Sequence, residues 1–302
     1  MKEEILIITI KKLSECSFAE AVEAWNKGFE GYFVDATTTV DRFLTRLVME
    51  GLSADLSIIA FQDEQPVGIV LSGVRTIDGK RVAWNGGTGV AASVRRQGLG
   101  RQLMNALVDV YREAGIDTAI LEAFRQNDKA IALYQQIGYE IIDNLIFLQR
   151  TDAMTKTLFY FENESAYQLK RGIPHDVCSL PFYQSMSPWQ TQWASVRDGE
   201  SLTILNVAGD TVGYAIYKRA FDEEGHLHSI TLMQCEAAPG IEDGDDIVRF
   251  ALSHLFAPFD VACRRTTFNL PVSNQRLIKI LEEAGFTLST EQVYMKMEMT
   301  QV

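Results

Sequence analysis

A run of arginine and glycine residues gives the clearest chemical signal in this 302-residue sequence. Residues 95–101 read Arg-Arg-Gln-Gly-Leu-Gly-Arg, and leucines then recur at Leu103 and Leu107, a spacing typical of an amphipathic helix. The first N–H groups of a helix lack internal acceptors and carry the positive end of its dipole. Gly98 and Gly100 keep side chains away from those N–H groups, and the arginines add positive charge. The run therefore predicts a site for a phosphate or diphosphate group.

Two common nucleotide-binding motifs do not fit this run. A P-loop requires Gly-x-x-x-x-Gly-Lys-Ser/Thr, which the sequence lacks. The dinucleotide-binding fingerprint requires a third glycine where Leu103 stands, and no clear ribose-binding acid follows at the usual distance. The structural alternative is a basic turn that merely opens a surface helix.

A second motif lies one predicted helix and one predicted strand further along the chain. Residues 127–139 read Asn-Asp-Lys-Ala-Ile-Ala-Leu-Tyr-Gln-Gln-Ile-Gly-Tyr. In this order, Arg95-x-x-Gly98-x-Gly100 and Asn-x-x-Ala-x-x-Leu-Tyr-x-x-x-Gly-Phe/Tyr resemble the GNAT superfamily, the GCN5-related N-acetyltransferases. The resemblance covers essentially residues 1–150 and implies that acetyl-coenzyme A (acetyl-CoA) is the co-substrate.

The resemblance also implies a coenzyme site. The diphosphate is expected on the N–H groups from Gln97 to Arg101, and the pantetheine arm beside the backbone near Val90. Asn127 is expected to contact that arm, although it could equally cap the following helix. The implied coenzyme-binding residues are Val90, Arg95, Arg96, Gln97, Gly98, Leu99, Gly100, Arg101 and Asn127.

Direct acetyl transfer to an amine needs an acid for the departing thiolate and a base for the ammonium. Tyr134 is the expected acid, because a phenol of pKa roughly 10 suits a thiolate of similar basicity; the alternative is a tyrosine whose ring simply packs in the core. The strand before the loop offers no carboxylate, so Glu122 is the nearest candidate base, with a salt-bridged edge residue or a water chain as alternatives. The acceptor is expected to contact Tyr32, Phe33, Trp84 and Asn85, of which the aromatic residues could equally be core.

Periodicity and turn signals predict the elements that position these residues. Strands are expected over residues 5–10, 56–61, 67–74, 81–90 and 118–123, helices after Ser17, after Thr39 or Asp41, and over residues 99–114 and 129–137, and a final hairpin over residues 139–149. Ser17 with Glu20 forms a predicted capping box, and Gly51 is expected to end the second helix. This β-α-α-β-β-β-α-β-α-β-β order matches the fold that the resemblance implies.

The second half of the chain repeats the pattern of the first. Asn274 and Gly285 stand 147 residues after Asn127 and Gly138, and the hairpins before them match as well. The sequence therefore predicts an α/β (α+β) chain of two tandem GNAT-like domains, residues 1–152 and 153–302, each with a mixed, mostly antiparallel twisted sheet flanked by helices. Leu281 replaces the motif tyrosine and the acidic run 239–246 replaces the basic loop, so the second domain is predicted to be degenerate.

Composition limits the classes of molecule that this protein is expected to bind. The formal net charge of -12 disfavours nucleic acid and is compatible with a cationic amine. We see no signal peptide and no apolar run of membrane-spanning length, which predicts a cytoplasmic protein. The four cysteines are widely spaced, so no metal site is expected. A homodimer is compatible with the sequence.

These observations predict an acetyl-CoA-dependent N-acetyltransferase whose first domain acts directly on a primary amine of a small molecule or protein. A non-catalytic acyl-CoA-binding sensor or scaffold protein is the alternative from another class. An O-acyltransferase on the same scaffold is a further alternative.

Overall fold

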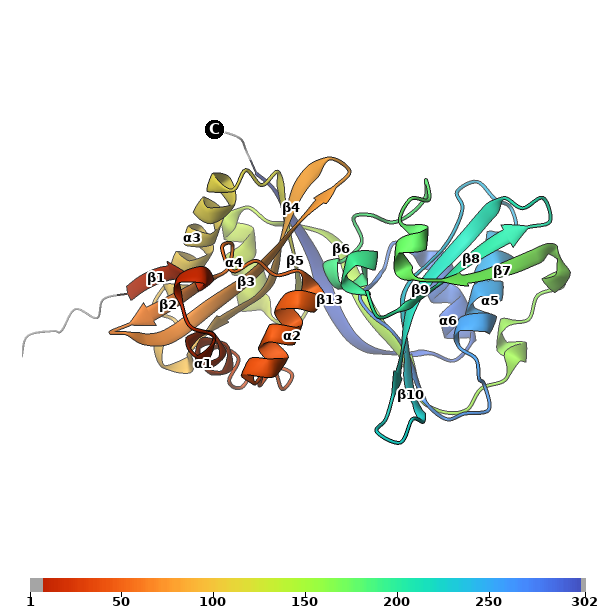
Figure 1. Ribbon diagram of the computed structural model, residues 1–302, viewed down its shortest axis with the longest axis horizontal. Coiled ribbons are helices and arrows are strands. Elements are labelled where there is room, and N and C mark those ends of the chain that lie inside the picture. The colour runs from red at the N-terminus through yellow and green to blue at the C-terminus, as the bar shows by residue number, and fades with distance from the viewer. Residues whose placement is uncertain (1–7, 300–302) are drawn as a thin grey trace, which may run out of the picture. The chain divides into compact units, whose positions relative to one another are not determined.

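The computed structural model describes residues 8–299 and divides into two compact units (Figure 1). The first unit consists of Met1–Ile142 and Tyr294–Val302, and the second of Asp143–Val293. This division differs from a single boundary after residue 152, because two long strands each begin in one unit and end in the other. Of the strand predicted over residues 5–10, residues 5–7 lie outside the described part of the chain.

The first unit follows the predicted order of elements. In chain order they are β1 (Ile8–Lys12), α1 (Phe18–Gly28), α2 (Val40–Glu50), β2 (Ile58–Gln62), β3 (Gln65–Ile77), β4 (Lys80–Val90), α3 (Leu99–Glu113), β5 (Thr118–Phe124) and α4 (Asp128–Ile137). The predicted capping box of Ser17 and Glu20 opens α1. Thr39 caps α2, and Gly51 ends it in the left-handed conformation that glycine adopts easily.

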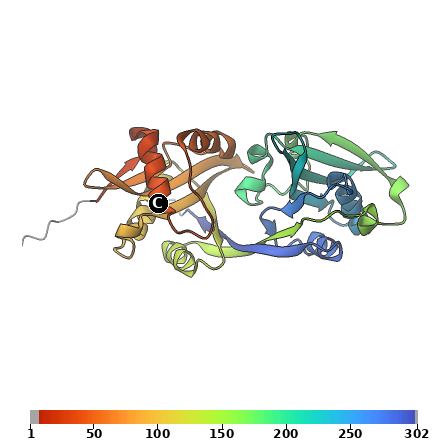
Figure 2. The same cartoon turned by 90° about the horizontal axis from the view of Figure 1, so that it is seen from below.

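The sheet of the first unit has the strand order β1-β2-β3-β4-β5-β13. Neighbouring strands from β1 to β4 run antiparallel, whereas β4 and β5 run parallel because α3 connects them. Figure 2 shows α1 and α2 on one side of this sheet and α3 and α4 on the other. Apolar side chains of α1 and α2 pack on the inner strands around Trp25, Phe43 and Ile69.

The hairpin predicted over residues 139–149 is wrong. Residues Glu140–Arg150 form one continuous strand, β6, which passes into the second unit and pairs there with β11 and β12. The stretch contains no glycine or Asn-Gly pair that would favour a tight turn. The place beside β5 is taken instead by the end of β13 (Thr287–Glu298), where Thr118 Oγ1 donates to Glu298 at 2.8 Å.

The second unit repeats this design. Its elements are β7 (Tyr167–Gly172), β8 (Glu200–Asn206), β9 (Thr211–Phe221), β10 (Leu227–Ala237), α5 (Gly244–Leu255), β11 (Arg264–Thr267), β12 (Leu270–Pro271) and α6 (Gln275–Glu283). Its strand order is β6-β11-β10-β9-β8-β7, and β10 and β11 are parallel like β4 and β5. The predicted tandem of two GNAT-like domains is thus confirmed. Within residues 8–299, no helix has both the length and the apolar character needed to cross a bilayer.

Candidate active site

Strands β4 and β5 diverge in the middle of the first unit. They pair from Val82 with Thr118 as far as Asn85 with Leu121, and then stop, although β4 continues to Val90. The N–H of Ala91 donates to Val67 O on β3, so by alternation the N–H groups of Val90 and Thr88 are directed away from β3. The divergence therefore leaves an open backbone edge that an extended ligand can pair with.

A β-bulge lies at the point of divergence. The register with β3 shifts between Asn85 and Gly87, so Gly86 is the extra residue of β4. The Asn85 side chain holds the bulge: its Oδ1 accepts from Gly87 N–H at 3.0 Å, and its Nδ2 donates to Thr88 Oγ1 at 2.9 Å. Asn85, which is predicted to contact the acceptor, is buried beside Met104.

The predicted diphosphate loop lies between β4 and α3. Gly98 is the N-cap of α3 and has φ of 85°, and no side chain caps the helix there. A Cβ added to Gly98 would meet no atom within 4 Å, whereas one on Gly100 would lie 3.3 Å from Leu133. The first N–H groups of α3 have no side-chain cap and lie at the positive end of the helix dipole. This arrangement fits a diphosphate.

Arg95 has a different surrounding from its neighbours in the loop. Its Nε donates to Val90 O at 2.8 Å, and its Nη2 donates to Gly28 O and Glu30 O at 3.1 and 3.0 Å. The guanidinium thereby ties the end of α1 to the end of β4. Arg101 pairs with Gln136 of α4, and Arg96 adopts φ of 65° in the exposed part of the loop.

The two neighbouring arginines should therefore respond differently to substitution. Arg95→Ala removes three hydrogen bonds to carbonyl oxygens and is expected to destabilise the unit by about 1–3 kcal/mol. Arg96→Ala is expected to leave the melting temperature unchanged and to weaken coenzyme binding by about tenfold through the loss of one charge near the diphosphate. Thermal unfolding and calorimetric titration of both variants measure this. Equal effects of the two substitutions on both quantities would contradict the assignment.

Tyr134 of α4 projects to the point where β4 and β5 separate. Its side chain is 7% exposed, and its hydroxyl forms a hydrogen bond with that of Thr88. Burial raises the pKa of Tyr134 to about 12; the bond to Thr88 lowers it in part, and nearby Tyr32 raises it further. The phenol is therefore protonated at neutral pH, as a proton donor must be.

Aromatic side chains border the opening on the side of α1. Tyr32 has its ring centroid 5.1 Å from Phe33 and 5.7 Å from Phe124, and Phe33 lies 5.9 Å from Phe124. Phe33 is 48% exposed. Tyr32 also forms a hydrogen bond with the Asn127 side chain, and burial raises its pKa. Asn127 Oδ1 accepts from Ala130 N–H at 3.4 Å, so Asn127 caps α4 and contacts Tyr32 at once.

Glu122 lies on β5 next to two large side chains. The indole Nε1 of Trp84 donates to Glu122 Oε2 at 2.6 Å, and Trp84 is only 2% exposed. Trp84, which is predicted to line the acceptor pocket, packs against Gly86 and donates its hydrogen bond to Glu122. On the neighbouring strand β13, burial raises the pKa of Tyr294, and the nearby Glu122 carboxylate raises it further.

Sequence reasoning named most of the residues that meet here, but not all. The structure brings Tyr32, Tyr134, Asn127 and Asn85 together around the divergence of β4 and β5, and Glu122 lies on β5 with Trp84. Thr88 links Asn85 to Tyr134 but was not among the predicted site residues. The only sequence feature that could have indicated it is its position three residues after Asn85. Tyr294 has no such feature, because it comes from the far end of the chain.

The corresponding helix start in the second unit is already filled. A Cβ on Gly244, at the first turn of α5, would lie 2.7 Å from Arg276 Cζ, so that guanidinium covers the helix start. Arg276 Nε donates to Asp245 Oδ1 at 2.8 Å, and Asp243, the N-cap, accepts from the Tyr167 hydroxyl. Carboxylates at a helix N-terminus satisfy its dipole and repel a diphosphate.

Glu236 takes the place that Gly89 has in the first unit, 147 residues earlier. Its Oε1 accepts from Asn274 Nδ2 at 2.8 Å, and burial raises its pKa to about 7 despite nearby Arg276 and that bond, which both lower it. The folded protein then holds a proton that the unfolded chain releases, so stability falls as pH rises from about 4.5 to 7.

Glu236→Gln should remove this loss of stability. Urea unfolding at pH 5 and pH 8 measures it. The variant is expected to match the wild type at pH 5 and to be more stable by about 1–3 kcal/mol at pH 8, because each pKa unit corresponds to about 1.4 kcal/mol. The same pH dependence in both proteins would contradict the shifted carboxyl.

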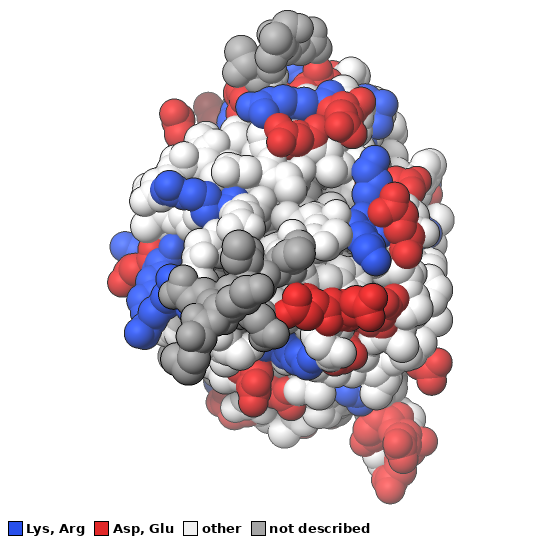
Figure 3. Space-filling model, turned by 90° about the vertical axis from the view of Figure 1, so that its left-hand side faces the viewer, with Lys and Arg blue, Asp and Glu red and all other residues white. Residues whose placement is uncertain are grey.

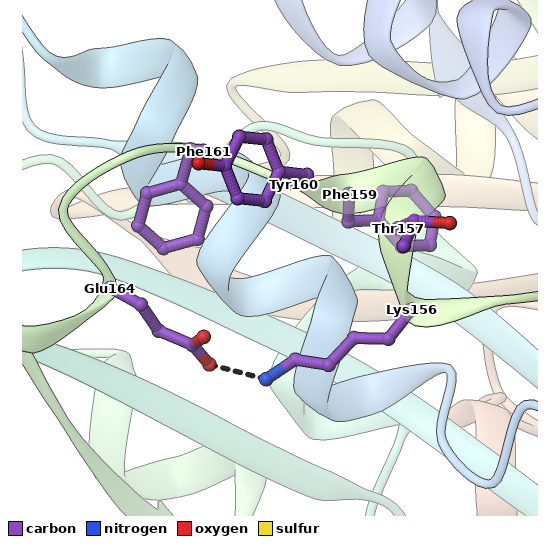
Figure 4. A pocket seen from close by; sticks show the side chains of 6 residues that line it. All are labelled: Lys156, Thr157, Phe159, Tyr160, Phe161 and Glu164. Carbon is purple, nitrogen blue, oxygen red and sulfur yellow. Dashed lines mark hydrogen bonds and ion pairs between the residues drawn. The ribbon is translucent and has the colours of Figure 1, made fainter.

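The second unit has a small surface pocket with fewer groups suited to catalysis than the site around Tyr134. The pocket has a volume of about 120 Å³ and is lined by Lys156, Thr157, Phe159, Tyr160, Phe161 and Glu164 (Figure 4). Lys156 and Glu164 pair with each other across it. Elsewhere in the described residues, no group of three or more His, Cys, Asp or Glu side chains could hold a metal ion.

Charge on the face of the molecule shown in Figure 3 is mixed. Lys and Arg lie interspersed with Asp and Glu and with uncharged residues. The described residues visible there form no continuous basic stripe of the kind that follows a nucleic-acid backbone.

Residues 18–139 match the model of the acetyltransferase (GNAT) family. The matched stretch contains the divergence of β4 and β5, the loop at α3 and Tyr134. The first unit therefore contains a domain of the GNAT family. GNAT proteins are acyltransferases that use acetyl-CoA, so the family and the fold indicate an acyl-CoA-dependent acetyltransferase. A comparison with curated proteins found no match.

Three solved structures share the fold over nearly the whole GNAT-like chain. A GCN5-related glucosamine N-acetyltransferase region of a fungal multi-domain β-N-acetylglucosaminidase has 14% identity and a TM-score of 0.69, over 97% of this chain and 38% of that one. A tandem GNAT protein from the clavulanic acid biosynthesis pathway has 12% identity and a TM-score of 0.60, over 98% and 99%. A GCN5-related N-acetyltransferase from Sphaerobacter thermophilus has 12% identity and a TM-score of 0.61, over 99% of this chain and 97% of that one. At these identities the likeness concerns the fold alone, and this chain spans only 38% of the fungal protein's length.

Proposed function

We propose that the first unit transfers an acetyl group directly from acetyl-CoA to a primary amine of a small molecule or peptide. One observation carries the proposal: β4 and β5 stop pairing after Asn85, Tyr134 projects to that point, and uncapped N–H groups of α3 lie at the far end of β4. The segment from Asn85 on β4 to the start of α3 thus combines a proton donor, an open strand edge and a candidate diphosphate site.

The residues present fit the coenzyme. Backbone N–H groups from Gln97 to Arg101 would hold the diphosphate, and the space above Gly98 admits it. The N–H groups of Val90 and Thr88 would pair with the amide groups of the arm, as in one more strand. When bound, acetyl-CoA supplies the acetyl group as an activated thioester.

Two side chains would handle the protons. The buried phenol of Tyr134 donates a proton toward the departing sulfur, because its raised pKa keeps it protonated until then. The carboxylate of Glu122, held by the Trp84 indole, accepts a proton from the amine. Backbone N–H groups of the diverging strand would stabilise negative charge on the carbonyl oxygen.

The aromatic border suggests how the acceptor is held. Tyr32, Phe33 and Phe124 present ring faces and edges beside the opening, and an ammonium group is attracted to such faces before it loses its proton. The net charge of -12 adds long-range attraction for a cation. An amine carried on an apolar or aromatic group is therefore the favoured acceptor class.

The test is acetyl transfer by the full chain. Thiol release from acetyl-CoA is followed across a panel of aliphatic, aromatic and peptide amines, and the products are analysed by mass spectrometry. An N-acetylated product with stoichiometric thiol release is expected. Tight coenzyme binding without turnover on any amine would favour a sensor or scaffold, and an ester product would favour an O-acyltransferase; either result would overturn the proposal.

A further inference from the structure

The peptide bond between Gly86 and Gly87 is held at both of its polar atoms. Arg46 Nη2, from α2, donates to Gly86 O at 2.7 Å. The N–H of Gly87 donates to Asn85 Oδ1 at 3.0 Å. Because this C=O and this N–H belong to the same rigid peptide plane, the two hydrogen bonds together fix its rotation.

Without such a hold this peptide would be free to turn. Both of its residues are glycines, which adopt many backbone conformations at little cost, and Gly87 has φ of 156°. Gly86 is also the bulged residue, so the regular ladder with β3 does not constrain it. The orientation of the bulge therefore depends on side chains, and Arg46 donates a hydrogen bond to it from outside β4.

Arg46 is itself well fixed. Its Nε donates to Glu50 Oε2 at 2.8 Å, and its guanidinium lies 4.5 Å from the centre of the Trp25 ring. That ring in turn rests against Gly87, where an added Cβ would lie 2.8 Å from it. Only 26% of the Arg46 side chain and 16% of that of Glu50 are exposed, so little mobility remains. A planar guanidinium is suited to bond and stack at once.

A series of hydrogen bonds connects the Gly86–Gly87 peptide to Tyr134, the proposed proton donor. Asn85 accepts from Gly87 and donates to Thr88, and Thr88 forms the hydrogen bond with Tyr134. A turn of the peptide would release the Asn85 amide and move Thr88, which follows it immediately in β4. The positions of Thr88 and of the Tyr134 phenol therefore depend on the same contact that Arg46 makes.

We infer that Arg46 is a positioning residue of the acetyl-transfer site, acting from α2 through the Gly86–Gly87 peptide on Thr88 and Tyr134. The inference rests on the proposed function. It adds a device outside both sequence motifs, and it links α2, beside the segment that carries Tyr32 and Phe33, to the catalytic strand.

The test compares Arg46→Ala and Arg46→Lys with Arg42→Ala, a matched control one turn earlier in α2 whose side chain is exposed. Four quantities are measured on the full chain: kcat, KM for acetyl-CoA, the calorimetric Kd of free CoA, and amide hydrogen exchange of residues 84–90 in the ligand-free protein. Melting temperatures are recorded alongside.

Arg46→Ala is expected to lower kcat about 10- to 100-fold, because small displacements of catalytic groups have effects of this size, with the Kd of CoA within about twofold. Exchange at Gly87 should accelerate at least about tenfold as its peptide is released. Arg46→Lys, which keeps the charge but not the planar fork, should recover part of kcat, and Arg42→Ala should match the wild type.

Unchanged kcat and unchanged exchange at Gly87 in both Arg46 variants would overturn the inference. So would a loss of kcat that Lys does not recover at all and that only follows a lower melting temperature, since that is the mark of a merely structural residue. If Arg46→Ala does not fold, Arg46→Lys decides alone through the same two quantities. Absence of acetyl transfer in the wild type would instead overturn the proposed function, while exchange at Gly87 would still test the hold on the peptide.

Discussion

Tyr134→Phe is expected to lower kcat at least about 100-fold and to leave the affinity for CoA within about twofold. The substitution removes only the hydroxyl that bonds to Thr88, and the ring keeps its packing in the core. Because burial raises the pKa of Tyr134 to about 12, the wild-type phenol donates throughout the usual assay range. The loss should therefore be the same from pH 6 to pH 9.

Tyr139→Phe is the matched control for this prediction. Tyr139 is buried just after α4, with its ring 6.1 Å from that of Tyr134, and its hydroxyl has no hydrogen-bond partner within the described residues. Removing that hydroxyl should leave kcat within about twofold of the wild type and should not lower stability. Steady-state kinetics and calorimetry of both variants measure the difference. Equal kcat values for the two would show that Tyr134 only packs.

The second large effect concerns the end of the chain. Deletion of residues 294–302 is expected to unfold the first unit or abolish its activity, because β13 forms the strand next to β5. The deleted segment buries four large side chains, at Tyr294, Met295, Met297 and Met299. At about 1.5–3 kcal/mol each, their burial amounts to roughly 6–12 kcal/mol, as much as the whole stability of an ordinary domain.

A milder pair of variants tests the same point in the full chain. Met295→Ala, at a fully buried position, should cost about 2–5 kcal/mol. Lys296→Ala, which removes an exposed ion pair with Glu298, should cost less than about 1 kcal/mol. Circular dichroism, urea unfolding and acetyl transfer are measured for the deletion and for both variants. A folded and active protein after deletion of residues 294–302 would contradict the role of this strand.

The sequence predicted the parts of the fold whose causes are local. Ser17 with Glu20 and Gly51 mark helix ends through residues no more than a few positions apart, and the structure has those ends there. The two motifs around Gly98 and Tyr134 likewise lie within single turns or helices. The 147-residue repeat predicted the tandem arrangement because both copies keep the same element order.

Contacts between distant residues could not be predicted in this way. Residues 140–150 form one strand, β6, where a hairpin was expected, because the strand beside β5 is supplied by residues 294–298 of β13. No sequence signal near residue 140 indicates that this distant segment takes that place. The contact of Arg95 with carbonyls of residues 28 and 30 depends on how α1 meets β4. The burial of Trp84 depends on Gly86 two positions later, since only a glycine leaves room for the indole. Arg46 belongs to the same class, as its partner Gly86 is 40 residues away.

The most direct test of the central claim is a crystal structure of the full chain with CoA bound. The account predicts one coenzyme per chain, with its diphosphate oxygens within hydrogen-bond distance of the backbone nitrogens of residues 97–101 and its sulfur beside Tyr134. Density for the diphosphate at the start of α5, or anywhere other than the junction of β4 and α3, would contradict it.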